Sequence, residues 1–319
     1  MAYSDHYIKL ANGSKISPVG FGTGTKWFKT SNPDVADEKT VEALVTALEA
    51  GQYHIDTAEI YNTHIEVATA LKRFFAANPS VKREDLWITD KFTPKSLSPL
   101  KVVNETLKEL GPSYLDLYLI HTPFLKKLAE TDDISLKQVW QEIEQLYEEG
   151  KIKNIGVSNF RPQDLDELLS FAKHKPVVNQ IEFSLVLQNQ SKGIYDYAQK
   201  HGIVLAAYSP LAPIYKASGP DYAKLSSKLE ELAKKYNKTT AQIALRWVNQ
   251  RNVIIVTTSA KKQRIIESLD IFDFELSKEE VEELTKLGEE SPEVRQYWEG
   301  LYYADSLYSS SFQGWLYDI

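Results

Sequence analysis

Residues 114–158 carry three patterns in succession: YLDLYLIH at 114–121, LKQVWQEIEQLYEEG at 136–150 and NIGVS at 154–158. The first and third patterns are short apolar runs, which are typical of buried strands. The apolar side chains between them recur at intervals of three and four residues, namely Leu136, Trp140, Ile143 and Tyr147. That spacing predicts an amphipathic helix. A strand, a helix and a second strand in this order favour a parallel sheet.

The same alternation continues along almost the whole chain of 319 residues. A chain of this length fits either two ordinary domains or one enlarged barrel. The pattern predicts eight strands, the number that closes a barrel: Val19–Gly22, His54–Asp56, Trp87–Lys91, Tyr114–His121, Asn154–Ser158, Val177–Glu182, Val204–Tyr208 and Val253–Thr257. Several of the intervening helices end at glycine, the usual C-terminal cap, as at Gly51, Gly111 and Gly150. We therefore predict an α/β fold, a (β/α)8 TIM barrel that occupies residues 1–319 as a single domain.

Three segments extend the plain repeat. A hairpin is expected at the N-terminus, with its turn at Asn12-Gly13. Residues 213–236 can hold an irregular loop and an extra helix between the seventh strand and its own helix. Residues 291–319 form a long C-terminal loop that is rich in aromatic residues and serine. This loop either folds over the mouth of the barrel and shapes a substrate pocket, or only packs over a helix.

The composition excludes several classes of function. The net charge of −7 comes from 44 acidic and 37 basic residues with no basic block, so nucleic acid is not expected as a partner. The absence of cysteine excludes disulfides and thiolate metal sites, and we expect no metal. No segment approaches the roughly 20 apolar residues needed to cross a bilayer. A cytoplasmic protein without a membrane partner is therefore predicted, and the oligomeric state stays open, with a monomer as one option.

Polar residues follow three neighbouring strands at the points where these strands end. Asp56 ends the second predicted strand, Lys91 the third and His121 the fourth, while Tyr61 lies in the loop after Asp56. Barrel enzymes carry their reactive groups at the C-terminal ends of strands. We therefore expect these four side chains to meet at one mouth of the barrel.

These four side chains suit proton delivery to a carbonyl group. Tyr61 donates the proton, and the charge of Lys91 stabilises the phenolate that remains. Asp56 pairs with Lys91, and His121 can donate a hydrogen bond to the substrate carbonyl. Taken singly, His121 could be structural, Lys91 a solvated charge and Asp56 a helix cap. Their occurrence together at successive strand ends favours a catalytic set.

Several spaced motifs resemble the aldo-keto reductase family: HIDTAEIY at 54–61, ITDKF at 88–92, LYLIH at 117–121, IGVSNF at 155–160 and FDFELS at 272–277. The resemblance covers nearly the whole chain. It implies that Tyr61 is the general acid, with Lys91, Asp56 and His121 as its partners. It also implies hydride transfer from a nicotinamide cofactor that is bound without a Rossmann fold. In agreement, GFGTGT at 20–25 does not have the glycine spacing of the dinucleotide fingerprint.

The resemblance extends to the residues that bind the nicotinamide half of the cofactor. It implies that Ser158, Asn159 and Gln180 hold the carboxamide and that Tyr208 stacks on the nicotinamide ring. It further places Ser209 and Leu211 near the pyrophosphate, and Gly22, Thr23 and Asp56 beside the nicotinamide. As alternatives, Tyr208 could be a core aromatic residue and Gln180 a strand-end hydrogen bonder.

The adenosine end departs from the family pattern. Where the family usually has Ile-Pro-Lys-Ser, this chain has VTTS at 256–259, so the lysine that would meet a 2′-phosphate is missing. Arg264 remains at its family position, and its planar guanidinium suits a phosphate. NADPH is therefore the expected cofactor, with an adenosine-side set of Thr258, Ser259, Lys261, Lys262, Arg264 and Glu267. The two lysines could instead be a solvated first turn of a helix.

Further motifs narrow the resemblance to a subfamily, the α-keto amide and conjugated polyketone reductases of yeasts: GTGTKW at 22–27, DKFTP at 90–94, LQNQ at 187–190, VTTSAKKQRI at 256–265 and YWEGLYY at 297–303. The resemblance implies small carbonyl substrates, namely activated ketones such as α-keto amides, α-keto esters and conjugated diketones. The implied substrate pocket consists of Lys26, Trp27, Phe28, Phe124, Tyr297 and Trp298, although the two tryptophans could be packing residues. The alternatives are a sugar-aldehyde reductase of the aldose or xylose type, or a slow nicotinamide-binding sensor or scaffold protein.

Overall fold

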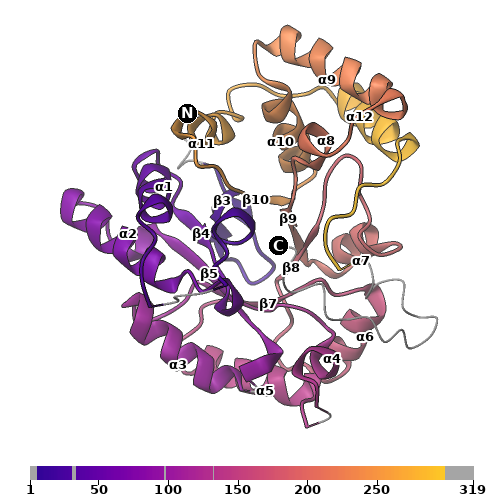
Figure 1. Ribbon diagram of the computed structural model, residues 1–319. Helices are drawn as coiled ribbons and strands as arrows, with labels where there is room; N and C mark the ends of the chain where they lie inside the picture. The colour runs from indigo at the N-terminus through magenta and orange to yellow at the C-terminus, as the bar shows by residue number, and fades with distance from the viewer. Residues whose placement is uncertain (1–5, 31–33, 97, 132, 299–319) are drawn as a thin grey trace.

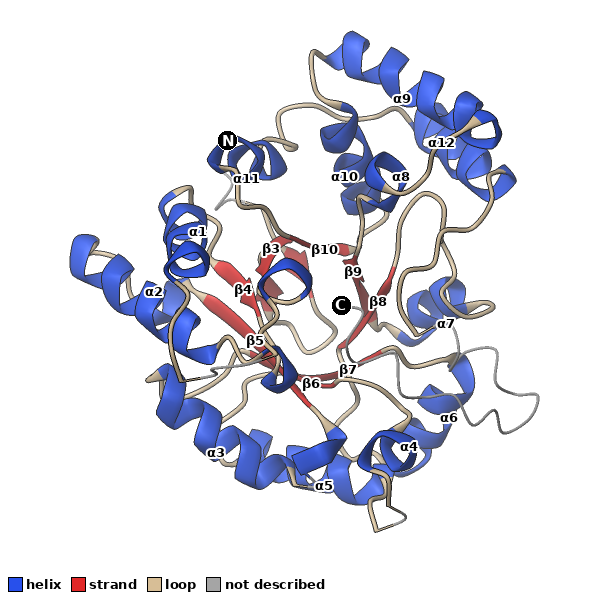
Figure 2. Ribbon diagram, viewed as in Figure 1, coloured by secondary structure: helices blue, strands red, loops and turns tan. Residues whose placement is uncertain are grey.

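Eight parallel strands form a closed barrel at the centre of the molecule, with helices arranged around it (Figures 1 and 2). The computed structural model describes residues 6–30, 34–96, 98–131 and 133–298. The strand order around the barrel is β10-β3-β4-β5-β6-β7-β8-β9. The strands are β3 (Val19–Gly22), β4 (His54–Asp56), β5 (Trp87–Phe92), β6 (Leu117–Ile120), β7 (Ile155–Ser158), β8 (Val178–Glu182), β9 (Val204–Tyr208) and β10 (Ile254–Thr257).

One helix follows each strand and covers the outside of the barrel. In chain order these helices are α1 (Glu38–Glu49), α2 (His64–Ala77), α3 (Pro99–Leu110), α5 (Leu136–Glu148), α6 (Pro162–Phe171), α7 (Ile194–His201), α10 (Thr240–Gln250) and α11 (Lys262–Leu269). Four more helices are added to this repeat: α4 (Leu125–Ala129), α8 (Ala212–Tyr215), α9 (Ala223–Tyr236) and α12 (Lys278–Glu290). The predicted (β/α)8 barrel is confirmed, including the extra helix before α10.

The strand bounds agree with the sequence prediction to within one residue except at β6. The prediction began this strand at Tyr114, whereas the structure begins it at Leu117. The Oδ2 atom of Asp116 accepts the Ile88 backbone N–H at 2.9 Å, in the place of a strand carbonyl. On the other side, Leu115 pairs through an isolated bridge to Ile152. A side chain that hydrogen-bonds the neighbouring backbone thus interrupts the regular ladder.

The predicted N-terminal hairpin is present and closes one end of the barrel. Strands β1 (Ile8–Lys9) and β2 (Lys15–Ile16) pair antiparallel around Gly13, whose φ of 89° is the left-handed conformation that glycine adopts easily. The apolar side chains of the hairpin pack on barrel residues that point inward, including Leu117, Val178, Val204 and Ile254. Because this end is filled with side chains, the opposite end, where the strands reach their C-termini, is the open one.

The C-terminal part of the chain returns to the barrel after α12. Residues 291–298 contain neither helix nor strand, as predicted for a loop. Most of the predicted aromatic loop, residues 299–319, lies outside the described residues. Over the described ranges, no helix is long and apolar enough to cross a membrane.

Helix α12 packs against the loop between β8 and α7 at Gly288. A Cβ atom at this glycine would lie 2.0 Å from the Leu185 carbonyl oxygen and 3.0 Å from Nε2 of Gln188. The Gln188 amide is itself fixed, because it donates to the backbone carbonyls of Leu185 and Thr285 at 3.1 and 2.8 Å. The close approach of helix and loop therefore requires a residue without a side chain.

We expect Gly288→Ala to lower the free energy of unfolding by about 1–3 kcal/mol, the usual range for overpacking. In an unconstrained helix the same change would be stabilising by up to about 1 kcal/mol. Urea unfolding followed by circular dichroism measures the difference. Ser227→Ala, on the exposed face of α9, serves as the control and should not destabilise the protein. An unchanged or increased stability of Gly288→Ala would contradict this packing.

Candidate active site

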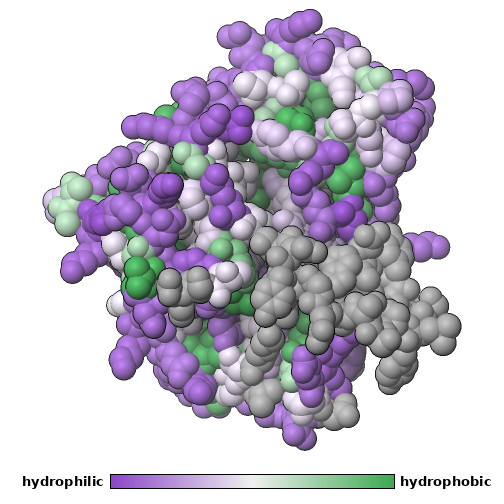
Figure 3. Space-filling model, in the orientation of Figure 1, coloured by the Kyte–Doolittle hydropathy of each residue, from purple (hydrophilic) through white to green (hydrophobic). Residues whose placement is uncertain are grey.

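A cavity of about 570 Å³ opens at the C-terminal end of the barrel. Figure 3 views this face and shows a hollow between hydrophilic surface residues. Most of the predicted site residues line the cavity: Gly22, Lys26, Phe28, Asp56, Tyr61, His121, Ser158, Asn159, Gln180, Tyr208, Ser209, Leu211, Thr258, Tyr297 and Trp298. Side chains from distant parts of the sequence therefore share one cavity.

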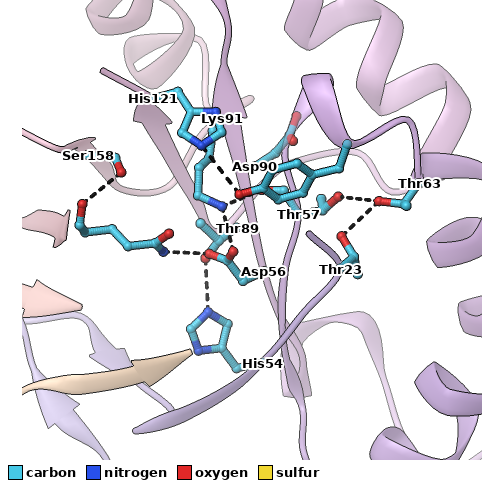
Figure 4. Close-up of polar contacts among 12 residues, drawn as sticks. Thr23, His54, Asp56, Thr57, Thr63, Thr89, Asp90, Lys91, His121 and Ser158 are labelled. Atoms are coloured by element: carbon cyan, nitrogen blue, oxygen red, sulfur yellow. Dashed lines mark hydrogen bonds and ion pairs between the residues drawn. The ribbon is translucent and has the colours of Figure 1, made fainter. Parts of the chain in front are cut away.

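Three of the four proposed catalytic side chains, Asp56, Tyr61 and His121, line this cavity, and Lys91 is buried behind them. Figure 4 shows Lys91 between Asp56 and His121. Nζ of Lys91 donates to Oδ1 of Asp56 at 2.6 Å and to the Thr57 carbonyl at 2.8 Å. The same ammonium lies 5.0 Å from the centre of the Tyr61 ring. The Tyr61 hydroxyl lies 3.4 Å from Nε2 of His121. The four residues therefore meet at the C-terminal end of the barrel, as their positions at the strand ends predicted.

The loop after β4 is shaped so that Tyr61 points back toward the barrel. Residues Glu59–Tyr61 form one turn of 3-10 helix, which ends at Asn62 in a left-handed conformation with a φ of 55°. The Glu59 carboxylate fixes the turn to the loop after β5 by accepting the Thr93 backbone N–H at 3.0 Å. Gly24 faces the ring, because a Cβ atom there would lie 2.8 Å from Cζ of Tyr61. The turn and the close approach of Gly24 thus fix where the phenol lies.

The charge of Lys91 is retained although the side chain is fully buried. Burial lowers the pKa of this ammonium, but the charge and hydrogen bond of Asp56 outweigh it, and the net pKa is raised. For Tyr61, burial raises the pKa, while the charge of Lys91 lowers it in the expected direction. The net pKa of Tyr61 is above its usual value of 10, so the hydroxyl holds its proton until charge develops on a substrate oxygen.

His121 is neutral in this environment. Burial lowers its pKa well below 6.5, and the nearby charge of Lys91 lowers it further. The backbone of His121 is held by Asn159, whose Nδ2 atom donates to the His121 carbonyl at 2.9 Å. A neutral imidazole beside the phenol can orient a carbonyl oxygen by a hydrogen bond without competing as an acid.

The predicted carboxamide-binding residues connect directly to the catalytic set. Nε2 of Gln180 donates to Oδ2 of Asp56 at 2.7 Å, and the Ser158 hydroxyl donates to the Gln180 carbonyl at 2.8 Å. The Tyr208 hydroxyl donates to Oδ1 of Asn159 at 2.8 Å. These amide and hydroxyl groups line the cavity beside the half-buried ring of Tyr208. A flat ring that carries a carboxamide, such as nicotinamide, fits this set of donors, acceptors and aromatic surface.

Of the six predicted adenosine-side residues, one lines the cavity. Thr258 lines the cavity and accepts a hydrogen bond from Nε1 of Trp27 at 2.7 Å. The Arg264 guanidinium lies 5.6 Å from the centre of the Tyr215 ring, which is also part of the lining. The members of the set other than Thr258 lie outside the lining. Ser259 and Lys261 precede α11, and Lys262, Arg264 and Glu267 lie on this helix.

The predicted substrate pocket is only partly brought together. Lys26, Phe28, Tyr297 and Trp298 line the cavity, but Trp27 and Phe124 do not. Trp27 is buried and bonded to Thr258, and Phe124 lies beneath the guanidinium of Arg161 at 5.4 Å. Among the predicted cofactor and catalytic residues, Thr23 and Lys91 are also absent from the lining, because both are buried behind it.

Three residues that the sequence analysis did not select have clear places at the site. Gly24 leaves room for Tyr61. Gln190 is buried and donates to Oδ1 of Asn159 at 2.9 Å and to the Tyr208 hydroxyl at 3.0 Å. Glu182 accepts backbone N–H groups of the C-terminal segment. The alternation of β8, which turns residues 180 and 182 to the same face, was the available signal for Glu182.

A second ionisable cluster lies behind the catalytic set, on the outer side of β5. His64 of α2 hydrogen-bonds Oδ1 of Asp90 at 3.2 Å and Oε2 of Glu109 at 3.1 Å. Burial of His64 lowers its pKa, but the two carboxylates outweigh this effect and raise the pKa to about 10. Asp90 directly precedes Lys91, so this imidazolium balances a buried carboxylate next to Lys91.

Comparison with known proteins identifies similar sequences and structures. Residues 18–289 match the sequence model of the Aldo/keto reductase family. The chain is 45% identical over 309 residues to an NADPH-dependent alpha-keto amide reductase of Saccharomyces cerevisiae, covering 95% of this chain and 97% of that protein. It is 36% identical to an NAD/NADP-dependent indole-3-acetaldehyde reductase of Schizosaccharomyces pombe, covering 87% and 94%. The crystal structure of an aldo-keto reductase of Bombyx mori in complex with NADP aligns with a TM-score of 0.77 at 32% identity, covering 88% and 92%.

The raised pKa of His64 predicts a specific dependence of stability on pH. The folded-state pKa of about 10 exceeds the unfolded value of about 6.5, so the stabilisation is complete below pH 6.5 and is lost as the pH rises through 10. We expect His64→Gln to lower the free energy of unfolding strongly near pH 6 and much less above pH 10, as measured by urea unfolding. His201→Gln, at an exposed position, is the control. A deficit that stays constant over this range would refute the charged state of His64.

Proposed function

Because this chain belongs to the aldo/keto reductase family, we propose that it is an NADPH-dependent carbonyl reductase with Tyr61 as general acid. The observation that carries the proposal is a direct hydrogen bond between the nicotinamide-side residues and the proposed catalytic residues. Gln180 of the nicotinamide-side set donates to Asp56, which in turn holds the ammonium of Lys91 beside Tyr61. Proton donor and cofactor-binding residues thus form one hydrogen-bonded unit.

The cofactor proposal rests on the polar groups that line the cavity. Ser158, Asn159 and Gln180 would hold the carboxamide, and Tyr208 would stack on the nicotinamide ring. Arg264, with Lys261 and Lys262, would neutralise the 2′-phosphate at the other end. Two findings support this cofactor: the Saccharomyces cerevisiae relative is named as NADPH-dependent, and the Bombyx mori structure contains NADP. When bound, NADPH supplies the hydride.

The residues of this chain supply the proton. As hydride adds to the carbonyl carbon, the π electrons of the C=O bond move to the oxygen, which takes the proton of the Tyr61 hydroxyl. The products are an alcohol and a phenolate, and the nearby ammonium of Lys91 stabilises the phenolate until it takes a proton from solvent. Asp56 keeps this ammonium charged and in place. Neutral His121 hydrogen-bonds the substrate oxygen and directs it toward Tyr61.

The substrates that we propose are activated ketones, namely α-keto amides, α-keto esters and conjugated diketones. The walls near Tyr61 are largely aromatic, with Phe28 at 6.2 Å between ring centres and Trp298 at 6.4 Å from His121. Such walls favour apolar or planar carbonyl compounds over polyhydroxylated sugars. The 45% identical relative is named for reduction of an alpha-keto amide. A higher kcat/KM for an aldopentose than for an α-keto ester would favour a sugar-aldehyde reductase instead.

The family match spans most of the chain, which supports the proposal of a single domain. We propose that this domain works as a cytoplasmic enzyme on small carbonyl compounds. The alternative of a slow nicotinamide-binding sensor would be favoured if NADPH binds tightly while turnover with activated diketones stays negligible.

We expect Tyr61→Phe to lower kcat for a simple diketone by at least about a hundredfold, because proton donation by a placed acid contributes on that order. The dissociation constant for NADPH should change little, since the substitution removes only the hydroxyl. NADPH oxidation is followed by its absorbance, and binding by quenching of protein fluorescence. Tyr222→Phe, at the end of the 3-10 helix before α9 and outside the cavity lining, is the control. Retention of most activity by Tyr61→Phe would refute the assigned acid.

We expect Arg264→Ala to lower kcat/KM with NADPH by about tenfold or more, because hydrogen bonds to charged groups are worth about 1.5–3 kcal/mol. The kcat/KM with NADH should stay within about twofold, since NADH has no 2′-phosphate. Lys278→Ala, an exposed residue of α12, controls for the loss of a positive charge. Equal losses with both cofactors, or equal efficiencies in the unmodified protein, would contradict the proposed phosphate site.

A further inference from the structure

We propose that Glu182 is a positioning residue that sets the selectivity for bulky ketones, because it holds the backbone of Gln296 and Tyr297 at the wall of the cavity. Residues 295–298 are called the C-terminal turn below. The inference rests on the proposed function and deepens it. It concerns a carboxylate that takes no part in the proton transfer described above.

Glu182 is placed at the mouth by the register of β8. It is the last residue of this strand and lies two residues after Gln180, so both side chains leave the same face of the barrel wall. The residue is only 1% exposed. Its carboxylate accepts the Gln296 backbone N–H at 2.9 Å through Oε1, and the Tyr297 backbone N–H at 3.2 Å through Oε2. One side chain thus fixes two successive peptide groups of the C-terminal turn.

A second contact ties the C-terminal turn to the cofactor-side residues. Nη2 of Arg295 donates to the Gln190 carbonyl at 2.6 Å. The Gln190 side chain accepts the Glu182 backbone N–H at 3.2 Å and donates to Asn159 and Tyr208. The turn is therefore attached to the same residues that position the nicotinamide-binding surface.

The anchored turn carries two aromatic rings into the lining of the cavity. The Tyr297 ring lies 5.8 Å from Tyr208, and the Trp298 ring lies 6.4 Å from His121. A small dicarbonyl can reach Tyr61 and His121 without filling the space between these rings. A bulky ketone has to occupy that space, so its binding depends on where the C-terminal turn is held.

The geometry calls for a carboxylate in particular. The Gln296 N–H lies 2.9 Å from Oε1 and 3.2 Å from Oε2, and the Tyr297 N–H lies 3.2 Å from Oε2, so both oxygens of the carboxylate accept hydrogen bonds. A glutamine amide would replace one of these oxygens by an NH₂ group, which cannot accept and would face a backbone N–H. Burial raises the pKa of Glu182 to about 7, against the effect of the backbone donors and of Arg295. A carboxyl group kept in this place despite its burial is typical of a functional position.

The test compares kcat and KM of Glu182→Gln for camphorquinone, a bulky diketone, and for methylglyoxal, a small dicarbonyl. At a pH of about 8.5, where Glu182 with its pKa of about 7 is charged, we expect KM for camphorquinone to rise about tenfold or more, since a hydrogen bond to a charged acceptor is lost. The kcat for either substrate, the KM for methylglyoxal and the dissociation constant for NADPH should stay within about twofold. Glu293→Gln removes an exposed carboxylate from the same segment and should change none of these values. Glu182→Asp, which keeps the charge, should lie between the wild type and Glu182→Gln.

A double-mutant cycle with Trp298→Ala tests whether Glu182 acts through the C-terminal turn. In the Trp298→Ala background, Glu182→Gln should no longer raise KM for camphorquinone, because the ring that it positions is gone. The same KM increase in both backgrounds, or equal losses for both substrates, would overturn the positioning role. If Glu182→Gln does not bind NADPH, Glu182→Asp takes its place in the cycle with the same criteria. A wild-type protein that oxidises NADPH with neither substrate would instead refute the proposed function, and the inference with it.

Discussion

The buried ion pair between Lys91 and Asp56 is the interaction on which the rest of the site depends. The ammonium is fully buried, so it can stay charged only because a carboxylate and a backbone carbonyl lie within 2.8 Å of it. The pair joins β4 to β5, and through Gln180 it reaches β8 on the far side of the barrel. The ion pair therefore contacts both the Tyr61 phenol, through Lys91, and the Gln180 amide, through Asp56. The barrel contributes the rigidity that keeps these groups at fixed separations.

Much of the fold and of the catalytic set could be predicted from the sequence, because both leave local signals. Strands that are buried on both faces appear as short apolar runs, and the polar residue that ends such a run marks the open end of the barrel. Asp56, Lys91 and His121 carry this signal. The start of β6 carries no such signal, because Asp116 lies inside an apolar run that looks like a continuous strand. Only the structure shows that the Asp116 carboxylate accepts a hydrogen bond from the Ile88 backbone N–H.

The remaining features depend on contacts between distant parts of the chain. Trp27 seemed a candidate for the substrate pocket, but it is buried against Thr258, which lies 231 residues further along. Phe124 packs under Arg161 instead of facing the cavity. The bond from Glu182 to the C-terminal turn joins positions 114 residues apart. No local pattern reports such pairings, because they follow from how the closed barrel brings its loops together.

The seam that closes the barrel has a consequence for how the protein is made. Strand β3 near the N-terminus pairs with β10, which begins at residue 254. While the chain leaves the ribosome, β3 and the growing end of the sheet therefore remain unpaired edges until β10 (Ile254–Thr257) has been synthesised. Open strand edges promote association between chains. When β10 pairs with both β3 and β9, the barrel closes. The strand edges through which nascent chains could associate are then covered.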